Sequence, residues 1–287
     1  MKLHTVETGN FKLDGGAMFG VVPKSLWQKW NTPDENNLCT WAMRCLLIEE
    51  GNRRILIDTG IGTKQDKKFF GHYHLHGEAT LEHSLKKLGF DTGDITDVLL
   101  THLHFDHCGG AVKREGDALL PAFENATYWT NEQHWLWAVN PNAREKASFL
   151  KENILPLQQS GQLKFIPLAG GDKNRLGETP FTENISIRFV HGHTRAMMLP
   201  QVKWRSHTLV YMADLLPSAA HVPLPYVMAY DMFPLTTLEE KKSFLEEAIA
   251  EDYVLYFEHD PKQECCRLQQ TEKGIRATAG FALSSLS

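Results

Sequence analysis

The chain has 287 residues, 42% of them hydrophobic, and a formal net charge of −5. This much apolar sequence can bury a sizeable core, and we expect a single domain over residues 1–287 because no repeat or linker divides it. The weakly acidic balance excludes the basic surface of a nucleic-acid-binding protein. With neither an apolar leader nor an apolar run of about 18 residues, the sequence predicts a cytoplasmic protein rather than a membrane protein.

The cysteines are odd in number and lack the spacing of a metal site. We therefore expect reduced thiols, as in a reducing compartment. The five are Cys39, Cys45, Cys108, Cys265 and Cys266.

The first elements in chain order are a hairpin, a loop and a helix. Apolar segments 41–51 and 53–60 flank a turn that contains Gly and Asn, which is typical of paired antiparallel strands. Segment 61–77 is bracketed by glycines and has no period, so it predicts a loop. Segment 79–89 carries leucines on one helical face and ends at Gly89, a typical C-cap.

The rest of the chain alternates strands and helices, which indicates an α/β (α+β) fold. We expect a kink or break at Pro156, and Thr236 with Glu239 suits a capping box. The charged run 239–242 (EEKK) predicts a solvated helix face. The strands are expected at 97–102, 126–131, 185–194, 207–216 and 253–260, and the helices at 142–161 and 236–252.

Side chains that bind metals follow four of these strands. Residues 101–107 read THLHFDH, and a histidine or an aspartate ends three later strands. Imidazoles and carboxylates are zinc ligands, and strand ends bring distant residues to one edge of a sheet. The candidate ligands are His102, His104, Asp106, His107, His193, Asp214 and His259.

The order of these motifs resembles the metallo-β-lactamase superfamily. H-x-H-x-D-H is followed by G-H-T, A-D and a late H-D, and segment 56–62 (LIDTGIG) is similar to the family's early strand-end motif, with Asp58 behind the metals. The resemblance covers nearly the whole chain. It implies an αββα sandwich of the metallo-β-lactamase type, with two metals at one edge.

The resemblance also implies a ligand set for two divalent metal ions. Asp214 would bridge them, with His102, His104 and His193 on one ion and Asp106, His107 and His259 on the other. His191 is the alternative to His193, which we prefer because it directly precedes Thr194, as in the family's G-H-T. Zinc is the first candidate, and manganese, iron and cobalt are alternatives for such ligands.

This site would make the chain a metal-dependent hydrolase of an ester or lactone bond. Two such ions can hold a hydroxide whose pKa is lowered to about 7 and which attacks the substrate. Asp106 can deliver a proton to the leaving group, and Asp214 bridges, so these two are the catalytic candidates. We expect a small-molecule substrate, with no nucleic acid or membrane as partner; a homodimer is left open.

The bridging aspartate narrows the reaction. Asp214 resembles that of the lactonases, glyoxalase II-type thioesterases and phosphotriesterases. Segments 14–27 and 212–231 resemble the branch that holds quorum-quenching N-acyl-homoserine lactonases and methyl parathion hydrolase-like enzymes. A lactonase of the N-acyl-homoserine type is therefore the first prediction. The alternatives are a phosphotriesterase, a thioesterase, or a mononuclear iron dioxygenase of thiol or persulfide substrates.

The chain departs from this branch at Pro217. Several lactonases carry there, three residues after the bridging aspartate, a tyrosine that helps to stabilise the oxyanion. Tyr226, Tyr230 and His221 are candidate replacements.

Other aromatic and polar groups have two interpretations each. The histidines of 72–76 (HYHLH) suggest a third metal site but fit a solvated lid better, and Cys108 fits a space-filling thiol better than a ligand. Several apolar side chains could wall an acyl or aryl pocket, or simply pack in the core or a lid. These are Met18, Phe19, Trp27, Phe69, Phe70 and Tyr73.

Overall fold

The structure is a computed structural model that describes residues 1–168 and 177–286. Its described residues form two compact units. Unit 1 comprises Met1–Asn10 and Met43–Pro167, and unit 2 comprises Phe11–Ala42 and Leu168–Ser287. The chain passes from one unit to the other within its two longest strands, β1 (Lys2–Asp14) and β2 (Leu38–Glu50).

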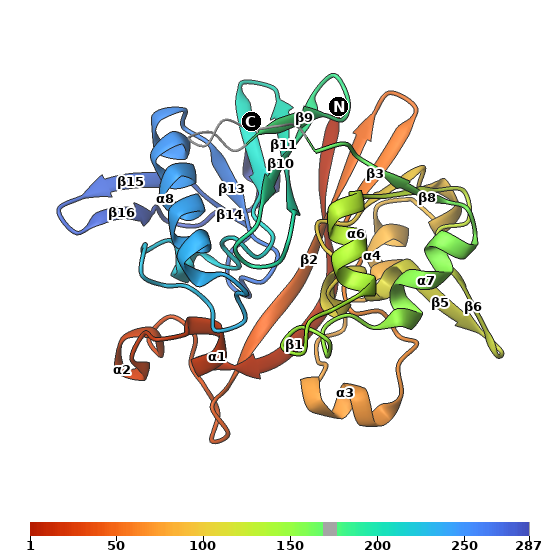
Figure 1. Ribbon diagram of the computed structural model, residues 1–287. Helices are drawn as coiled ribbons and strands as arrows, with labels where there is room; N and C mark the ends of the chain where they lie inside the picture. Colours follow the sequence, from red (N-terminus) through yellow and green to blue (C-terminus); the bar gives the residue numbers. More distant parts are fainter. Residues whose placement is uncertain (169–176, 287) are drawn as a thin grey trace. The chain divides into compact units, whose positions relative to one another are not determined.

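Unit 1 is built on a six-stranded sheet of order β1-β2-β3-β4-β7-β8 (Figure 1). The predicted hairpin is confirmed: β2 and β3 (Arg53–Ile57) are antiparallel, and Glu50 pairs with Arg53 across the turn. The next three strands run parallel to β3 and to one another, so their carboxyl ends share one edge. These are β4 (Asp97–Leu99), β7 (Thr127–Thr130) and β8 (Leu163–Phe165).

Helices α4 (Leu81–Lys87), α6 (Glu132–Val139) and α7 (Lys151–Gln159) gather beside this sheet (Figure 1). Leu85 of α4, Trp135 of α6 and Leu157 of α7 share one buried cluster with strand residues such as Val98. Burial of these apolar faces is what docks the helices on the sheet.

Two predictions for unit 1 need correction. Segment 61–77 contains a helix, α3 (Lys67–Tyr73), because Asp66 caps Phe69 N–H at 2.7 Å and Phe69 and Tyr73 both pack on Phe105. In segment 142–161 only α7 is helical, and it continues past Pro156. Unit 1 also contains the one-turn helix α5 (Phe105–Cys108), the hairpin β5 (Val112–Glu115) with β6 (Ala118–Pro121), and the 3-10 turns η1 (Thr92–Asp94) and η2 (Gly109–Ala111).

Unit 2 is built on a sheet of order β14-β13-β12-β11-β10-β9. Both β10 and β12 are antiparallel to β11, and β12 is parallel to β13, so β10, β12 and β13 all point the same way. Their carboxyl ends therefore share one edge of the sheet. The strands are β9 (Glu178–Pro180), β10 (Ile185–Val190), β11 (Met197–Trp204), β12 (His207–Tyr211), β13 (Val254–Tyr256) and β14 (Cys265–Cys266).

Helix α8 (Pro234–Ala250) lies beside this sheet in Figure 1. Phe244 and Leu245 are buried on it, and Arg188 of β10 donates to Glu247 of α8 at 2.8 Å. The helix begins at Pro234, two residues before the predicted capping box, since proline is preorganised for the first helical position. Unit 2 also contains α1 (Gly15–Phe19), α2 (Lys24–Trp27), η3 (Ala219–His221), the hairpin β15 (Leu268–Thr271) with β16 (Gly274–Ala277), and η4 (Leu283–Ser285).

The charged run of α8 is not the solvated face that its sequence predicts. Glu239 and Lys242 are exposed, but Glu240 is 8% and Lys241 0% exposed. A run of charged residues in the sequence does not show which of its side chains are exposed and which are buried against hydrogen-bond partners.

The five cysteines are all buried and none of them forms a disulfide in the described part of the chain, which agrees with the predicted thiols. Among the helices of residues 1–168 and 177–286, none combines the length and the apolar character of a membrane span.

Candidate metal centre

The predicted ligands occupy equivalent places in the two units. His102 lies three residues after the last residue of β4, and His193, Asp214 and His259 lie three residues after β10, β12 and β13. Each unit therefore gathers its candidates at the carboxyl edge of its sheet. We call Asp58, His102, His104, Asp106 and His107 the unit 1 group, and His193, Asp214, Asp231 and His259 the unit 2 group.

Asp58 organises the unit 1 group. Its carboxylate accepts from Thr101 N–H at 2.8 Å and from the Thr101 hydroxyl at 2.6 Å, and it lies 3.1 Å from His107 Nδ1. Because the Thr101 proton goes to Asp58, the threonine oxygen can accept from His102 Nδ1 at 3.1 Å. One buried carboxylate thus fixes the tautomers of His102 and His107, leaving Nε2 of each to bind a cation.

His104 is held by a different carboxylate. Its Nε2 lies 3.1 Å from Oε1 of Glu145, whose other oxygen accepts from Trp137 Nε1 at 2.7 Å. With Nε2 donating to this buried carboxylate, Nδ1 is the nitrogen of His104 that can bind a cation. The loop itself is fixed by His134, whose Nε2 accepts from Leu103 N–H at 2.9 Å.

Asp106 and His107 lie in the single turn of α5, which begins directly after His104. His104 has extended backbone angles, so the chain changes from extended to helical between the H-x-H and D-H parts of the motif. The two halves of the motif therefore lie on either side of a bend in the chain. Asp106 Oδ2 lies 3.8 Å from His107 Nε2, so the carboxylate faces the nitrogen that Asp58 leaves available.

In the unit 2 group, one carboxylate faces two histidines. Asp214 Oδ2 lies 3.1 Å from His193 Nε2, and Asp214 Oδ1 lies 3.2 Å from His259 Nε2. The opposite nitrogens are also held: His193 Nδ1 lies 2.8 Å from Asp231, and His259 Nδ1 donates to the Ala42 carbonyl at 2.7 Å. Both histidines therefore present Nε2 toward Asp214.

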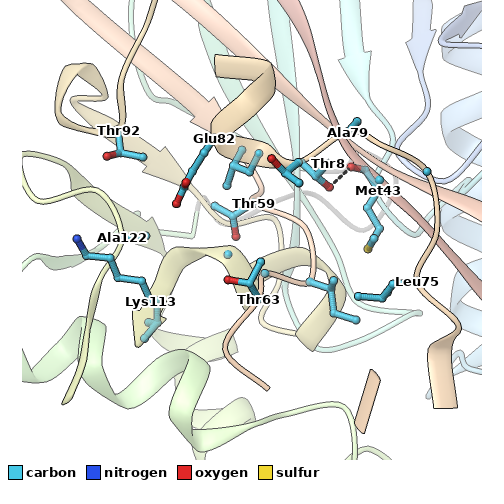
Figure 2. Close-up of a pocket in the computed structure, with 18 of the residues that line it drawn as sticks. Thr8, Met43, Thr59, Thr63, Leu75, Ala79, Glu82, Thr92, Lys113 and Ala122 are labelled. Carbon is cyan, nitrogen blue, oxygen red and sulfur yellow. Dashed lines mark hydrogen bonds between the residues drawn. The ribbon is translucent and has the colours of Figure 1, made fainter. Parts of the chain in front are cut away.

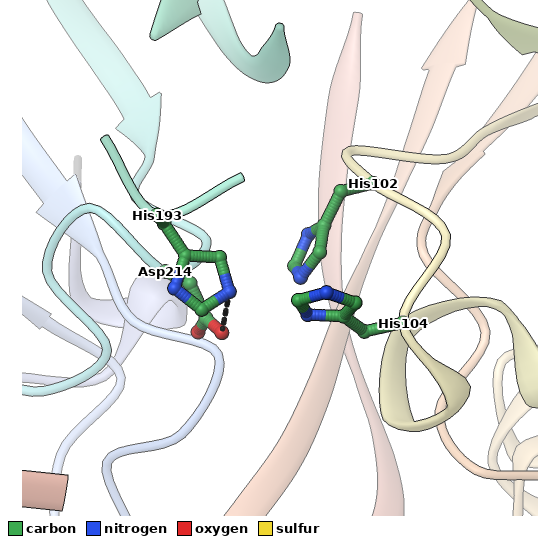
Figure 3. Close-up of side chains that lie close together, drawn as sticks. All are labelled: His102, His104, His193 and Asp214. Carbon is green, nitrogen blue, oxygen red and sulfur yellow. Dashed lines mark ion pairs between the residues drawn. The ribbon is translucent and has the colours of Figure 1, made fainter. Parts of the chain in front are cut away.

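The electrostatics of this group favour a positive charge. Burial lowers the pKa of His193, but the carboxylates of Asp214 and Asp231 outweigh it and raise that pKa to about 10. A nitrogen whose surroundings favour a proton this strongly also favours a cation. Figure 3 draws the His193–Asp214 ion pair of unit 2, together with His102 and His104 of unit 1.

The donor set fits divalent metal ions on two observations. The side chains are imidazoles and carboxylates, which zinc and related ions take as ligands. Each candidate histidine also has one ring nitrogen held by a carboxylate, a hydroxyl or a backbone carbonyl, as metal-bound histidines almost always do.

Two other candidate histidines, His191 and His221, have hydrogen-bond partners of their own. His191 Nδ1 accepts from Ala196 N–H at 3.2 Å, which supports the preference for His193. His221 bonds Ser218 Oγ at 2.8 Å and the Met18 carbonyl at 2.9 Å, so both of its ring nitrogens are used. Burial first, and then the charge of Lys241, lower the pKa of His221 to about 3, so it is neutral.

The remaining sequence candidates are mostly structural. His72, His74 and His76 are exposed, as a solvated segment predicts. Burial raises the pKa of the Cys108 thiol to about 12, which keeps it protonated. Phe19 stacks between Trp27 at 5.3 Å and His221 at 4.6 Å, and Met18, Phe19 and Trp27 are at most 1% exposed, so these three belong to the core of unit 2. Phe69, Phe70 and Tyr73 are partly exposed on α3.

A cavity of about 390 Å³ lies within unit 1 (Figure 2). Thr59, Ile61 and Gly62 line it from the segment that follows Asp58, and Gly110 lines it from the segment after His107. None of the predicted ligands lines this cavity, so it is separate from the metal-binding candidates.

Four residues that hold the candidates were not predicted. None of the four belongs to a recognised sequence motif, and only Thr101 is adjacent to one, the H-x-H-x-D-H motif. Glu145 fell within the segment predicted to be helical, and Asp231 follows no predicted strand. The four are Thr101, His134, Glu145 and Asp231.

Comparisons with known proteins agree with the motif. The sequence model of the metallo-beta-lactamase superfamily matches residues 44–259. The N-acyl homoserine lactonase of Bacillus thuringiensis is 23% identical over 282 residues, covering 93% of this chain and 96% of the relative.

Solved structures are also similar. A probable metal-dependent hydrolase from Staphylococcus aureus has a TM-score of 0.87 and 28% identity, covering 100% of this chain and 98% of its own. A dizinc quorum-quenching lactonase in complex with a product has a TM-score of 0.76 and 22% identity, covering 98% and 95%. The predicted fold class is therefore confirmed, and the chain belongs to the metallo-beta-lactamase superfamily, as a metal-dependent hydrolase.

Proposed function

We propose that this chain is a dinuclear metal-dependent hydrolase that opens a lactone ring of the N-acyl-homoserine type. The observation that carries the proposal is Asp214, whose two oxygens face His193 Nε2 and His259 Nε2 at 3.1 and 3.2 Å. A carboxylate in that position can hold one cation through each oxygen. His102, His104 and His193 would hold one ion, and Asp106, His107 and His259 would hold the second.

The chain's own residues prepare this centre before substrate arrives. Two divalent cations supply a water of lowered pKa and a polarised substrate carbonyl. Asp58, Glu145 and Asp231 hold one ring nitrogen of His107, His104 and His193, so that the other nitrogen of each ring is turned to where a cation would bind. Asp106, only 8% exposed, takes up the proton of the attacking water and delivers it to the leaving oxygen.

The lactone assignment is supported by the relatives. The curated lactonase matches this chain over nearly its full length, and one solved neighbour holds N-hexnoyl-L-homoserine, the product of lactone opening. The dizinc centre of that neighbour also supports two ions. The match covers 93% of this chain and 96% of the curated lactonase, which supports one functional domain over 1–287.

The oxyanion is stabilised differently from the lactonases that carry a tyrosine at position 217. Here the Pro217 carbonyl accepts from His259 N–H at 3.1 Å, so this position supports a candidate ligand instead. His221 is excluded as a donor because its one proton goes to the Met18 carbonyl. Tyr226 and Tyr230 remain the candidates, and Tyr230 is 38% exposed.

The test is base consumption by zinc-loaded protein in a pH-stat, with N-acyl-homoserine lactones of several chain lengths. We expect fast lactone opening that a chelator stops and added metal restores. His102→Ala and Asp214→Ala should remove it from a folded chain, whereas the exposed His72→Ala is the matched control. Turnover of only a phosphotriester or a thioester would replace the lactone as the assigned substrate. Oxygen uptake with one iron per chain would overturn the assignment as a lactone hydrolase.

A further inference from the structure

Two adjacent charged residues of α8 are buried where the sequence predicts a solvated face. Glu240 is 8% and Lys241 0% exposed, whereas Glu239 and Lys242 on either side are exposed. Burying two charges costs several kcal/mol each unless hydrogen bonds compensate. The hydrogen-bond partners of Glu240 and Lys241 therefore indicate which segments the two side chains hold in place.

Glu240 binds the loop that leads into His193. Its two carboxylate oxygens accept from the backbone N–H groups of His191 at 2.7 Å and Gly192 at 3.0 Å. The same loop is fixed to the start of α8, because Phe233 N–H donates to the Gly192 carbonyl at 2.8 Å. Contact is so close that a Cβ on Gly192 would lie 2.3 Å from Thr237 N.

Lys241 binds a turn in the segment of the chain between residues 214 and 231. Its ammonium donates to the carbonyls of Pro223 at 2.8 Å, Leu224 at 3.3 Å and Tyr226 at 2.9 Å. A lysine has three N–H donors, so all of them have an acceptor in this turn. Five residues after Tyr226 comes Asp231, whose Oδ1 lies 2.8 Å from His193 Nδ1.

We propose that Glu240 and Lys241 are positioning residues that aim His193: Glu240 fixes the backbone of its loop, and Lys241 fixes the turn that brings Asp231 to its ring. The inference rests on the proposed function, in which His193 is a metal ligand. Both residues act through others and touch neither substrate nor metal. Their effect should appear in the geometry and affinity of the metal centre.

The variants are Glu240→Gln, which keeps one acceptor oxygen and removes the charge, and Lys241→Met, which keeps the length and removes the donors. Exposed Glu239→Gln and Lys242→Met are the matched controls on the same helix. Lys241→Arg, which restores donors, is the rescue. In the metal-free proteins, we expect faster amide exchange in peptides covering 188–196 for Glu240→Gln and 222–232 for Lys241→Met, and no change for the controls.

The decisive readouts use cobalt-substituted protein. We expect both variants to change the visible Co²⁺ spectrum, to weaken metal binding by about 10–100-fold and to lower kcat with little change in KM. Lys241→Arg should recover part of each loss. A lowered melting temperature with a wild-type spectrum and wild-type kcat would overturn the positioning role.

Failure of the two proposals can be told apart. If the wild type binds cobalt but turns over no lactone, the proposed substrate fails while the spectrum still tests positioning. If Lys241→Met does not fold, Glu240→Gln decides, and wild-type exchange and a wild-type Co²⁺ spectrum in that variant overturn the inference.

Discussion

Asp58→Asn is the substitution that tests most directly how the unit 1 group is held in place. Asp58 has a φ of 57°, a left-handed conformation that asparagine tolerates well, so the backbone is not strained by the change. With the amide oxygen accepting from Thr101 N–H, the amide nitrogen faces two donors, the Thr101 hydroxyl and His107 Nδ1. Two hydrogen bonds to a charged acceptor are lost, each worth about 1.5–3 kcal/mol.

We therefore expect the free energy of unfolding of the metal-free chain to fall by about 3–6 kcal/mol. Zinc affinity should fall by about 10–100-fold, because His102 and His107 both lose the partner that fixes their tautomers. Urea unfolding measures the first quantity and titration against a chromophoric chelator the second. Asp66→Asn, at the exposed cap of α3, is the control and should change neither by much. Wild-type zinc affinity in Asp58→Asn would refute the role of Asp58.

Three further outcomes are expected. Gly192→Ala should lower stability by about 1–3 kcal/mol and reduce kcat, since the added Cβ would lie 2.3 Å from Thr237 N; an unchanged melting temperature would contradict this. Burial raises the pKa of Glu240 from 4.5 to about 7, and the negative charges of Asp231 and Glu239 raise it further. The two N–H groups that donate to Glu240 lower this pKa, but by less. The folded state holds this proton longer than the unfolded state, so between pH 4.5 and 7 the wild type should lose about 3 kcal/mol more stability than Glu240→Gln; parallel curves in thermal unfolding would disprove it. Cys108, with burial raising its pKa to about 12, should react with a thiol reagent only on unfolding, and fast labelling of the native chain, read by mass spectrometry, would count against that.

The sequence predicts the parts of this molecule that depend on local pattern. Two apolar segments and a turn of Gly and Asn are enough for the β2–β3 hairpin, and leucine spacing with Gly89 is enough for α4. Four of the candidate ligands also follow a local pattern, because His102, His193, Asp214 and His259 each stand three residues after a buried strand.

What the sequence does not predict depends on partners that are distant along the chain. Glu240 and Lys241 look like any exposed helical pair, and only the N–H groups of the 191–192 segment and the carbonyls of the 223–226 turn account for their burial. Helix α3 was missed because glycines outweighed a short aromatic stripe whose partner, Phe105, lies in another segment.

The path of the chain through its two units has a consequence for synthesis. Unit 2 begins with Phe11–Ala42, but the rest of it starts only at Leu168, so Met43–Pro167, the larger part of unit 1, is made in between. At roughly 5–20 residues per second, the 120 residues from Leu168 to Ser287 take about 6–24 s to emerge. During that interval unit 1 can fold with its histidines in place, while Phe11–Ala42 still lacks the rest of unit 2 to pack against.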